Sequence, residues 1–394
     1  MKQPYLKKWG LVIFITMLST IPPLATDMYM PALPEMVNVF NTTTTMTSFT
    51  MTIFFVCMAI GILLFGPLSD KFGRKKILII SISLTFIFSI LCSLSPTIEF
   101  LIVVRAIQAL GAGGMVTTAT ALIRDSFEAQ EMSQVLSITQ ALSFLAPMLA
   151  PLIGAFILLH FDWSKTFVAL AILNFISLIG ALLLKETLPN ENRTNDGVFH
   201  SIFSIVTVLK NKTFTGYFLI GSILTAPFMA YIAVASYVYI NGFGISETAF
   251  SIYFAITSGV AVIGPLLYMR IGHKSVRSNF IVVFALIFIS AILILTIGQL
   301  TPVLFLISFV LFAMAATYFR PMISSLMLQS QSTNIGAASA MMNFGFTMVG
   351  SIAMFIGSQD WSSYVTGIAM TIFIFYAVAL IMLVFALNKK LIKI

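Results

Sequence analysis

Residues 66–76 read GPLSDKFGRKK, a short polar segment between two long apolar runs. A weaker copy, GPLLYMRIGHKS, stands at 264–275, about 198 residues further along the chain. Each copy falls between the second and third apolar runs of its half of the sequence. A weak internal repeat is typical of transporters built from two similar helical bundles, with the binding site where the halves meet. The two segments therefore predict a duplicated membrane fold.

The composition excludes an ordinary soluble domain. Apolar residues make up 59% of the chain and charged residues 9%, and the mean hydropathy is +1.04. A soluble domain carries about 25% charged residues, so this chain has too few to cover a surface that faces water. Lipid can face such a chain, and the bilayer interior favours helices because they satisfy their own backbone groups. We expect an all-α integral membrane protein.

Twelve segments are long and apolar enough to span a bilayer, which takes about 20 residues. They cover 9–31, 46–68, 77–95, 98–123, 133–160, 164–184, 213–240, 246–269, 279–298, 302–327, 335–357 and 363–387. The Pro22-Pro23 pair and the later prolines of the first segment predict either a kink or a continuation toward Asn38. The N-terminus shows no small-residue cleavage site, so we expect the first segment to be a retained span.

The basic residues predict the orientation. With both termini in the cytoplasm, 18 of the 21 lysines and arginines lie in inner segments and only Lys165 lies outside. Arg105 and Arg320 fall within spans. Cytoplasmic loops of membrane proteins carry such an excess. The net charge of +8 is therefore attributed to topology and contact with lipid headgroups, and we expect no nucleic-acid partner.

The longest polar break divides the chain into two halves. We expect an N-terminal six-helix bundle at 1–185, a cytoplasmic linker at 186–211 and a C-terminal six-helix bundle at 212–394. The linker is too short for a folded catalytic domain, so a flexible connector is expected.

These segments resemble a known family. GPLSDKFGRKK resembles the loop between helices 2 and 3 of the major facilitator superfamily, and over its whole length the chain resembles that superfamily's twelve-span drug–proton antiporters of the Bcr/CflA type. TDMYMPALP at 26–34 is similar to the helix-1 signature of this type. The resemblance implies multidrug efflux and antibiotic resistance, driven by protons without a cofactor. It also implies a protein of the bacterial cytoplasmic (inner) membrane that works as a monomer.

The loop at 66–76 is expected to form a cytoplasmic gate through Gly66, Asp70, Gly73 and Arg74. The glycines permit a tight turn and a close helix approach. Asp70 can accept hydrogen bonds from a helix N-terminus or pair with an arginine. The second copy has Tyr268 in the place of Asp70, so it does not predict a matching latch.

Two more motifs carry the resemblance. RAIQALGAGG at 105–114 is similar to the helix-4 motif, in which the embedded arginine, here Arg105, is linked to proton transfer. The alternative is a structural arginine that bonds backbone carbonyls. APMLAPLIGA at 146–155 is similar to the helix-5 antiporter motif, with Pro147, Ala150, Pro151 and Gly154 as its members. A generic face for helix packing is the alternative reading of this motif.

Asp27 is the only one of thirteen carboxylates well inside an apolar run. A charged side chain at the centre of a bilayer costs about 2.5 kcal/mol or more, so such a residue usually has a function. A carboxylate can also take up a proton. Competition between proton and substrate at Asp27, with Arg105 as the nearby cation, would couple their movements in opposite directions. The alternative is a residue at a helix bend, solvated through the outer mouth.

Polar and aromatic residues within the spans are the candidates for contact with small lipophilic or cationic substrates. They are Tyr29, Gln108, Gln140, Phe144, Asn174, Tyr231, Tyr237, Arg320, Asn343 and Phe346. Arg320 has no counterpart in the first half of the repeat. It can pair with a carboxylate or phenolate of the substrate, or bond helix carbonyls.

Sequence signatures of other functions are missing. The chain has no GxxxxGK[ST] loop for ATP, no HExxH or CxxC metal spacing and no GxSxG elbow, so we expect neither an enzyme nor a metal site. Cys57 and Cys92 both lie in apolar runs and predict no disulfide framework. Two alternatives stay open. One is a transporter, exporter or symporter, that is specific for one metabolite or siderophore, and the other is a receptor or structural protein with this fold that does not transport.

Overall fold

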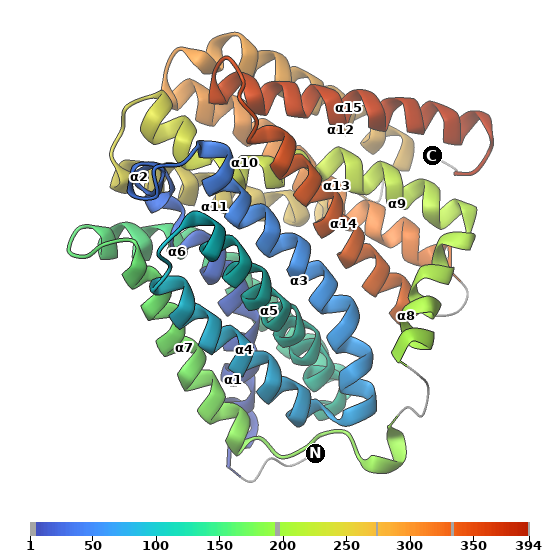
Figure 1. Cartoon of the computed structure of the whole chain (residues 1–394). Helices are drawn as coiled ribbons and strands as arrows, with labels where there is room; N and C mark the ends of the chain where they lie inside the picture. Colours follow the sequence, from blue (N-terminus) through green and yellow to red (C-terminus); the bar gives the residue numbers. More distant parts are fainter. Residues whose placement is uncertain (1–4, 194–197, 273–274, 332–334, 393–394) are drawn as a thin grey trace. The chain divides into compact units, whose positions relative to one another are not determined.

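The computed structural model describes residues 5–193, 198–272, 275–331 and 335–392. All regular elements in these ranges are helices (Figure 1). Eleven helical segments of the described chain are long and apolar enough to cross a membrane. The remaining predicted span corresponds to α6 (Ala129–Leu158), in which the apolar stretch among the described residues is Leu145–Leu158. The chain is a multi-pass α-helical membrane protein, as its composition predicts.

The helices form two compact units. Unit 1 comprises Met1–Thr42 and Ile53–Phe203, and unit 2 comprises Thr43–Thr52 and Ser204–Ile394. Unit 1 holds α1 (Lys7–Asp27), η1 (Met30–Ala32), α2 (Leu33–Val39), most of α3 (Thr44–Phe72), α4 (Arg74–Ser93), α5 (Ile98–Ser126), α6, α7 (Ser164–Leu183) and η2 (Asn190–Asn192). Unit 2 holds the end of α8 (Val198–Thr207), η3 (Val208–Lys210), α9 (Lys212–Thr225), α10 (Pro227–Ser236), η4 (Tyr237–Gly242), α11 (Glu247–Ile271), α12 (Val276–Leu295), η5 (Ile297–Gln299), α13 (Pro302–Gln329), α14 (Ile335–Gly357) and α15 (Tyr364–Asn388).

The two units repeat one packing pattern. In unit 1, α4 packs on α5 and α7, and α1 packs on α5 and α6. In unit 2, α12 packs on α13 and α15, while the α9–α10 segment packs on α13 and α14. In each half the third span thus contacts the fourth and sixth, and the first contacts the fourth and fifth. The pseudo-symmetric pair of six-helix bundles predicted from the sequence repeat is confirmed.

The first span breaks at Asp27. Pro31 has no N–H, so the carbonyl of Asp27 cannot receive the next helical hydrogen bond, and α1 ends there. One turn of 3₁₀-helix follows at Met30–Ala32, and α2 carries the chain on to Val39. The first span is therefore three helical pieces, where the sequence predicted either a kink or a continuation.

The seventh span is also interrupted, which the sequence reading of 213–240 as one helix did not predict. Pro227 cannot donate to the carbonyl of Ile223, so α9 ends at Thr225 and α10 begins at Pro227. The last six residues, Tyr237–Gly242, form a π-helix. Helical structure also occurs in the segment between the halves, where α8 and η3 lie within the expected connector.

Candidate functional site

Asp27 is buried at the C-terminal end of α1. Its side chain is 3% exposed, and Thr26 donates a hydrogen bond from Oγ1 to Oδ1 of Asp27 at 2.8 Å. No lysine or arginine of the described residues forms an ion pair with Asp27, so the carboxylate has no direct counter-ion. Burying a charge without a paired cation is costly, which makes the protonation of Asp27 the main electrostatic variable of this region.

Arg105 on α5 holds the chain on both sides of Asp27. The guanidinium is fully buried. Its Nη1 donates to the carbonyl oxygen of Ala25 at 2.9 Å, and its Nη2 donates to the hydroxyl of Tyr29 at 3.3 Å. Arg105 therefore bonds a backbone carbonyl, which is what the alternative interpretation of a structural arginine predicts. The carbonyl belongs to Ala25, two residues before Asp27, the candidate for proton coupling.

Three aromatic rings surround the guanidinium. Its Cζ lies 4.8 Å from the ring centre of Tyr29, 4.2 Å from that of Phe54 and 5.6 Å from that of Phe167. Rings at this range stabilise a buried cation. The sequence did not identify Phe54 and Phe167, because nothing distinguishes them from the other phenylalanines of a chain that contains 37.

Gln108 links Arg105 to α4. Its Oε1 accepts from Arg105 Nη1 at 2.8 Å, and its Nε2 donates to Ser89 Oγ at 2.7 Å. Ser89 in turn donates to the carbonyl of Thr85 at 2.6 Å. Arg105, Tyr29 and Gln108 thus form one hydrogen-bonded network within unit 1, which holds the chain on either side of Asp27. We refer to these three residues together with Asp27 as the unit-1 cluster.

The helix-5 motif contacts the chain directly after Asp27. A β-carbon at Gly154 would overlap the carbonyl oxygen of Met28, so α6 and the break of the first span touch through their backbones. Ala150 and Pro151 are buried on α6, and Pro147 lies one turn before Pro151. The close packing expected of the small residues of this motif is present at Gly154.

The loop at 66–76 forms an ion network within unit 1. Arg74, only 2% exposed, pairs with Asp70 at 2.5 Å and with Asp125 on α5 at 2.9 Å, and it donates to Ser69 Oγ at 2.7 Å. Arg124 lies 3.9 Å from Asp70. Of the two roles considered for Asp70, the structure shows pairing with an arginine. Asp125 was not identified from the sequence.

The N-terminus of α4 is capped by Glu186, which the sequence also did not identify. The Glu186 carboxylate accepts from the backbone N–H of Arg74 at 3.0 Å and of Lys75 at 3.2 Å. Gly73 has φ +98°, and a β-carbon there would overlap the side chains of Glu186 and Arg193. A glycine is required at this turn for both reasons. Gly66, by contrast, has open space where a β-carbon would lie.

Other predicted substrate residues are buried in separate places. Asn174 on α7 donates to the carbonyl of Leu170 at 2.8 Å. Tyr231 stacks on Phe309 with ring centres 4.0 Å apart, and the hydroxyl of Tyr237 lies 2.5 Å from Thr47 Oγ1. The side chains of Gln140 and Phe144 lie outside the described residues.

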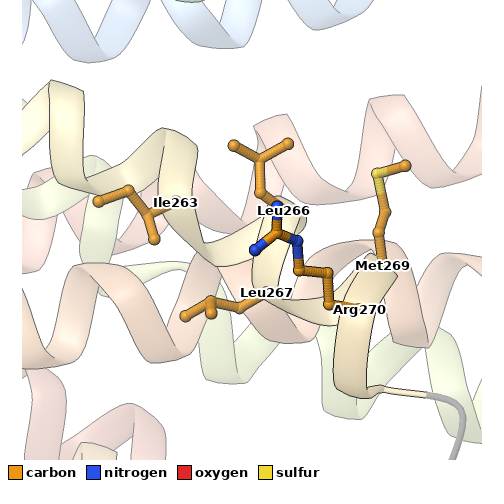
Figure 2. A pocket seen from close by; sticks show the side chains of 5 residues that line it. All are labelled: Ile263, Leu266, Leu267, Met269 and Arg270. Atoms are coloured by element: carbon orange, nitrogen blue, oxygen red, sulfur yellow. The ribbon is translucent and has the colours of Figure 1, made fainter.

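Arg320 and Phe346 meet in unit 2. The Cζ of Arg320, on α13, lies 5.0 Å from the ring centre of Phe346 on α14. Asn343, one turn before Phe346, is exposed. A hollow of about 310 Å³ in unit 2 involves none of the predicted residues (Figure 2). Its lining is Ile263, Leu266, Leu267, Met269 and Arg270, all on α11.

Comparison with known proteins gives consistent results. Residues 13–358 match the Major Facilitator Superfamily. An uncharacterized MFS-type transporter, YdgK of Bacillus subtilis (strain 168), is 31% identical over 88% of each chain. A bicyclomycin resistance protein homolog of Haemophilus influenzae is 27% identical over 67% of this chain and 66% of its own. The multidrug resistance protein MdtL of Escherichia coli O9:H4 is 26% identical over 61% of both chains.

Solved structures show the same fold at low identity. A peptide transporter, POT, in complex with sulfate aligns over 99% of this chain and 97% of its own with a TM-score of 0.77 and 13% identity. A D-xylose–proton symporter aligns over 95% and 97% with a TM-score of 0.74 and 17% identity. The family match over residues 13–358 and the relative that is 31% identical show that the chain belongs to the major facilitator superfamily, and that it is a membrane transporter of small substrates and not an enzyme.

Proposed function

We propose that this transporter exports small lipophilic compounds in exchange for protons, with Asp27 as the group at which proton and substrate compete. The observation that carries the proposal is the position of Asp27, a buried carboxylate at the break of the first span that has no direct counter-ion in the described part of the chain. The names of two relatives, a bicyclomycin resistance protein homolog and a multidrug resistance protein, support export of such compounds.

The proposed cycle assigns roles to the unit-1 cluster. Facing outward, Asp27 takes up a proton. Facing inward, it releases the proton and accepts a hydrogen-bond donor or positive group of the substrate, so that the site never holds both. Arg105 and Gln108 fix the broken chain around Asp27, because they join Ala25, Tyr29 and Ser89 in one network. The Asp70–Arg74 network serves as the cytoplasmic gate.

The energy comes from the proton gradient, and no cofactor takes part. One proton that moves down 100 mV releases about 2.3 kcal/mol, which supports roughly forty-fold accumulation of substrate. We place the protein in the bacterial cytoplasmic membrane as a monomer with both termini in the cytoplasm. Bundles at 1–185 and 212–394 are its moving halves, and 186–211 connects them.

The test is expression in a bacterium whose own efflux pumps are deleted. We expect raised tolerance to at least one of three compounds of different charge, neutral bicyclomycin, cationic ethidium and anionic nalidixic acid, and we expect a protonophore to abolish the accumulation difference. Tolerance unchanged for all three compounds, or efflux that ignores the protonophore, would contradict the proposal.

A further inference from the structure

Arg320 differs from Arg105, the other arginine inside a span, in having no polar partner. Arg105 is fully buried and donates hydrogen bonds to Ala25, Gln108 and Tyr29. Arg320 is exposed, and within the described residues it donates no hydrogen bond and forms no ion pair. Among the described residues, its guanidinium lies over the ring of Phe346, 5.0 Å from the ring centre. Arg320 therefore has all its N–H groups available to a ligand, whereas Arg105 is already bonded.

Arg320 lies deep within its membrane span, so leaving its N–H groups without hydrogen-bond partners is costly. It lies nine residues before the end of α13 at Gln329, about 14 Å along a helix that rises 1.5 Å per residue. The 28 residues of α13 span about 42 Å, and the hydrocarbon core is about 30 Å thick. A helix centred in the core therefore places Arg320 about 7 Å from the middle, inside the hydrocarbon region. An arginine inside the hydrocarbon region is costly unless it is paired. A single ring beneath it offsets only part of that cost, and an anion can offset more.

The surroundings of Arg320 are polar on the exposed side. Ser324 lies one turn after it on α13 and is partly exposed, and Asn343 lies one turn before Phe346 on α14 and is exposed. The outer helices of the same unit are different. In the range 280–295 of α12 and the range 364–387 of α15, every exposed residue is apolar, as lipid requires. Arg320 thus belongs to a face of unit 2 that carries hydrogen-bond donors.

The charges within the spans agree with this placement. Two arginines, Arg105 and Arg320, and one carboxylate, Asp27, are embedded there. The interior keeps an excess positive charge whether Asp27 is ionised or protonated, and within the described residues Arg320 is the embedded arginine that has no polar partner. A guanidinium pairs with planar oxyanions through two parallel hydrogen bonds, and this geometry favours a carboxylate or a sulfonate.

We propose that Arg320, seated on the ring of Phe346, binds the acidic group of the transported compound, so that the substrates include lipophilic organic acids. That these acids are exported rests on the proposed function, but their binding to Arg320 does not. Asn343 and Ser324 supply further donors at the edge of the same subsite. The Phe346 ring orients the guanidinium and offers a flat apolar surface to an aromatic substrate.

The experiment compares three ligands that share one ring system and differ in charge: 2-naphthoate, 2-naphthalenemethanol and 2-naphthylmethylammonium. Binding is measured at pH 7 by equilibrium dialysis of the full chain in lipid nanodiscs, with empty nanodiscs subtracted. We expect the wild type to bind the naphthoate about tenfold more tightly than the alcohol, a typical gain from a charge-assisted hydrogen bond. The ammonium should bind most weakly.

Variants then locate the preference. R320Q should remove the tenfold preference without changing the affinity for the alcohol, and R320K should keep part of it. F346L should weaken naphthoate binding by roughly threefold through loss of the ring beneath the guanidinium. The matched control is R270Q, because Arg270 is an exposed arginine of the same unit that lines the α11 hollow. Its substitution should leave the preference intact, and thermal unfolding of each variant shows that it is folded.

Three outcomes would overturn the proposal. In the first, the wild type shows no preference for the acid, which includes the case in which neither ligand binds measurably. In the second, the preference for the acid survives in R320Q. In the third, the preference is lost in R270Q. Failure of the export proposal looks different. A chain that binds naphthoate through Arg320 but exchanges no proton contradicts export alone, whereas proton-coupled export of the ammonium with no Arg320-dependent acid binding contradicts this inference alone.

Discussion

At the residue scale, one guanidinium holds three separate pieces of unit 1 together. Arg105 bonds the first span through Ala25 and Tyr29, its own helix through Gln108, and it lies between the rings of Phe54 and Phe167. Only a planar group with several fixed donors makes these contacts at once. The arrangement keeps Asp27 in place without neutralising it directly.

Replacement of Arg105 by lysine tests this geometry. An ammonium retains the charge but cannot reach the Ala25 carbonyl, Gln108 and Tyr29 together, so R105K should reduce proton-linked efflux about tenfold. Stability should fall by about 1–2 kcal/mol through lost hydrogen bonds. The matched control is R277K at the start of α12, where the arginine is exposed. Equal efflux from R105K and R277K, measured in everted membrane vesicles, would contradict the assigned role.

Sequence reasoning identified residues of rare type and missed those of common type. Asp27, Arg105 and Gln108 were found because a polar group inside an apolar run is conspicuous. Ser89, Phe54 and Phe167 complete the same site, but serine and phenylalanine are ordinary residues of a membrane helix. Their roles depend on which helices pack together, and only the folded chain shows that.

At the scale of elements, the break in the first span is held by its contact with α6. Prolines remove the hydrogen bonds that would continue α1, and Gly154 lets the backbone of α6 reach the carbonyl of Met28. The position of Asp27 therefore depends on a residue that lies 127 positions later in the chain.

A methyl group at 154 should separate these elements. G154A places a β-carbon on the Met28 carbonyl oxygen, and such overpacking costs about 1–3 kcal/mol. G10A is the matched control in α1, since its β-carbon would meet only the side chain of Leu6 at 3.7 Å. It should be neutral or stabilising by up to about 1 kcal/mol, because alanine favours helix. Unfolding temperatures measured in one detergent decide between these results, and a G154A protein as stable as G10A would exclude the close contact.

The cap of α4 gives a second prediction at this scale. E186Q should lose the charge-assisted bonds to the N–H groups of Arg74 and Lys75 and weaken the helix start by about 1 kcal/mol. Hydrogen exchange of peptides that cover 73–78 should then be about fivefold faster. E191Q, an exposed glutamate of the same connecting segment, is the control and should leave exchange unchanged. If the amides of 73–78 exchange as slowly in E186Q as in the wild type, the Glu186 cap does not stabilise the start of α4.

Element boundaries were predicted well where periodic apolar runs end in loops and poorly where proline acts inside a run. The spans at 98–123 and 302–327 match α5 and α13 closely. The seventh span was read as one helix, although Pro227 divides it and its end is a π-helix. Proline removes a hydrogen bond at a known position, but whether the helix bends or breaks there depends on what packs against it.

At the scale of the whole molecule, the distribution of charge predicts its orientation. Eighteen of 21 basic residues fall on one side of the membrane when the termini are cytoplasmic. A reporter enzyme that is active only outside the cytoplasm should be active when fused after Lys165 and inactive when fused after Lys390. The reverse pattern would invert the topology and would place the Asp70–Arg74 network on the outer side.

The internal repeat was readable from the sequence, but its functional asymmetry was not. GPLSDKFGRKK and GPLLYMRIGHKS predicted two similar bundles, and the repeated packing of α4 and α12 agrees. Among the described residues, the embedded carboxylate lies in unit 1, and the embedded arginine without a polar partner lies in unit 2. The proposed mechanism uses this asymmetry, with proton coupling in one half and recognition of an acidic group in the other.

The central claim is that Asp27 carries the proton, and the most direct measurement follows protons in proteoliposomes. The compound with the largest effect on tolerance is added under an imposed pH gradient, and an enclosed pH dye records the exchange. The amide of D27N can still accept the hydrogen bond from Thr26, so this variant should keep the local structure and bind the compound. Because the amide takes up no proton, D27N should show no substrate-induced proton flux, while D27E should retain part of the flux. Undiminished proton exchange in D27N would contradict the account.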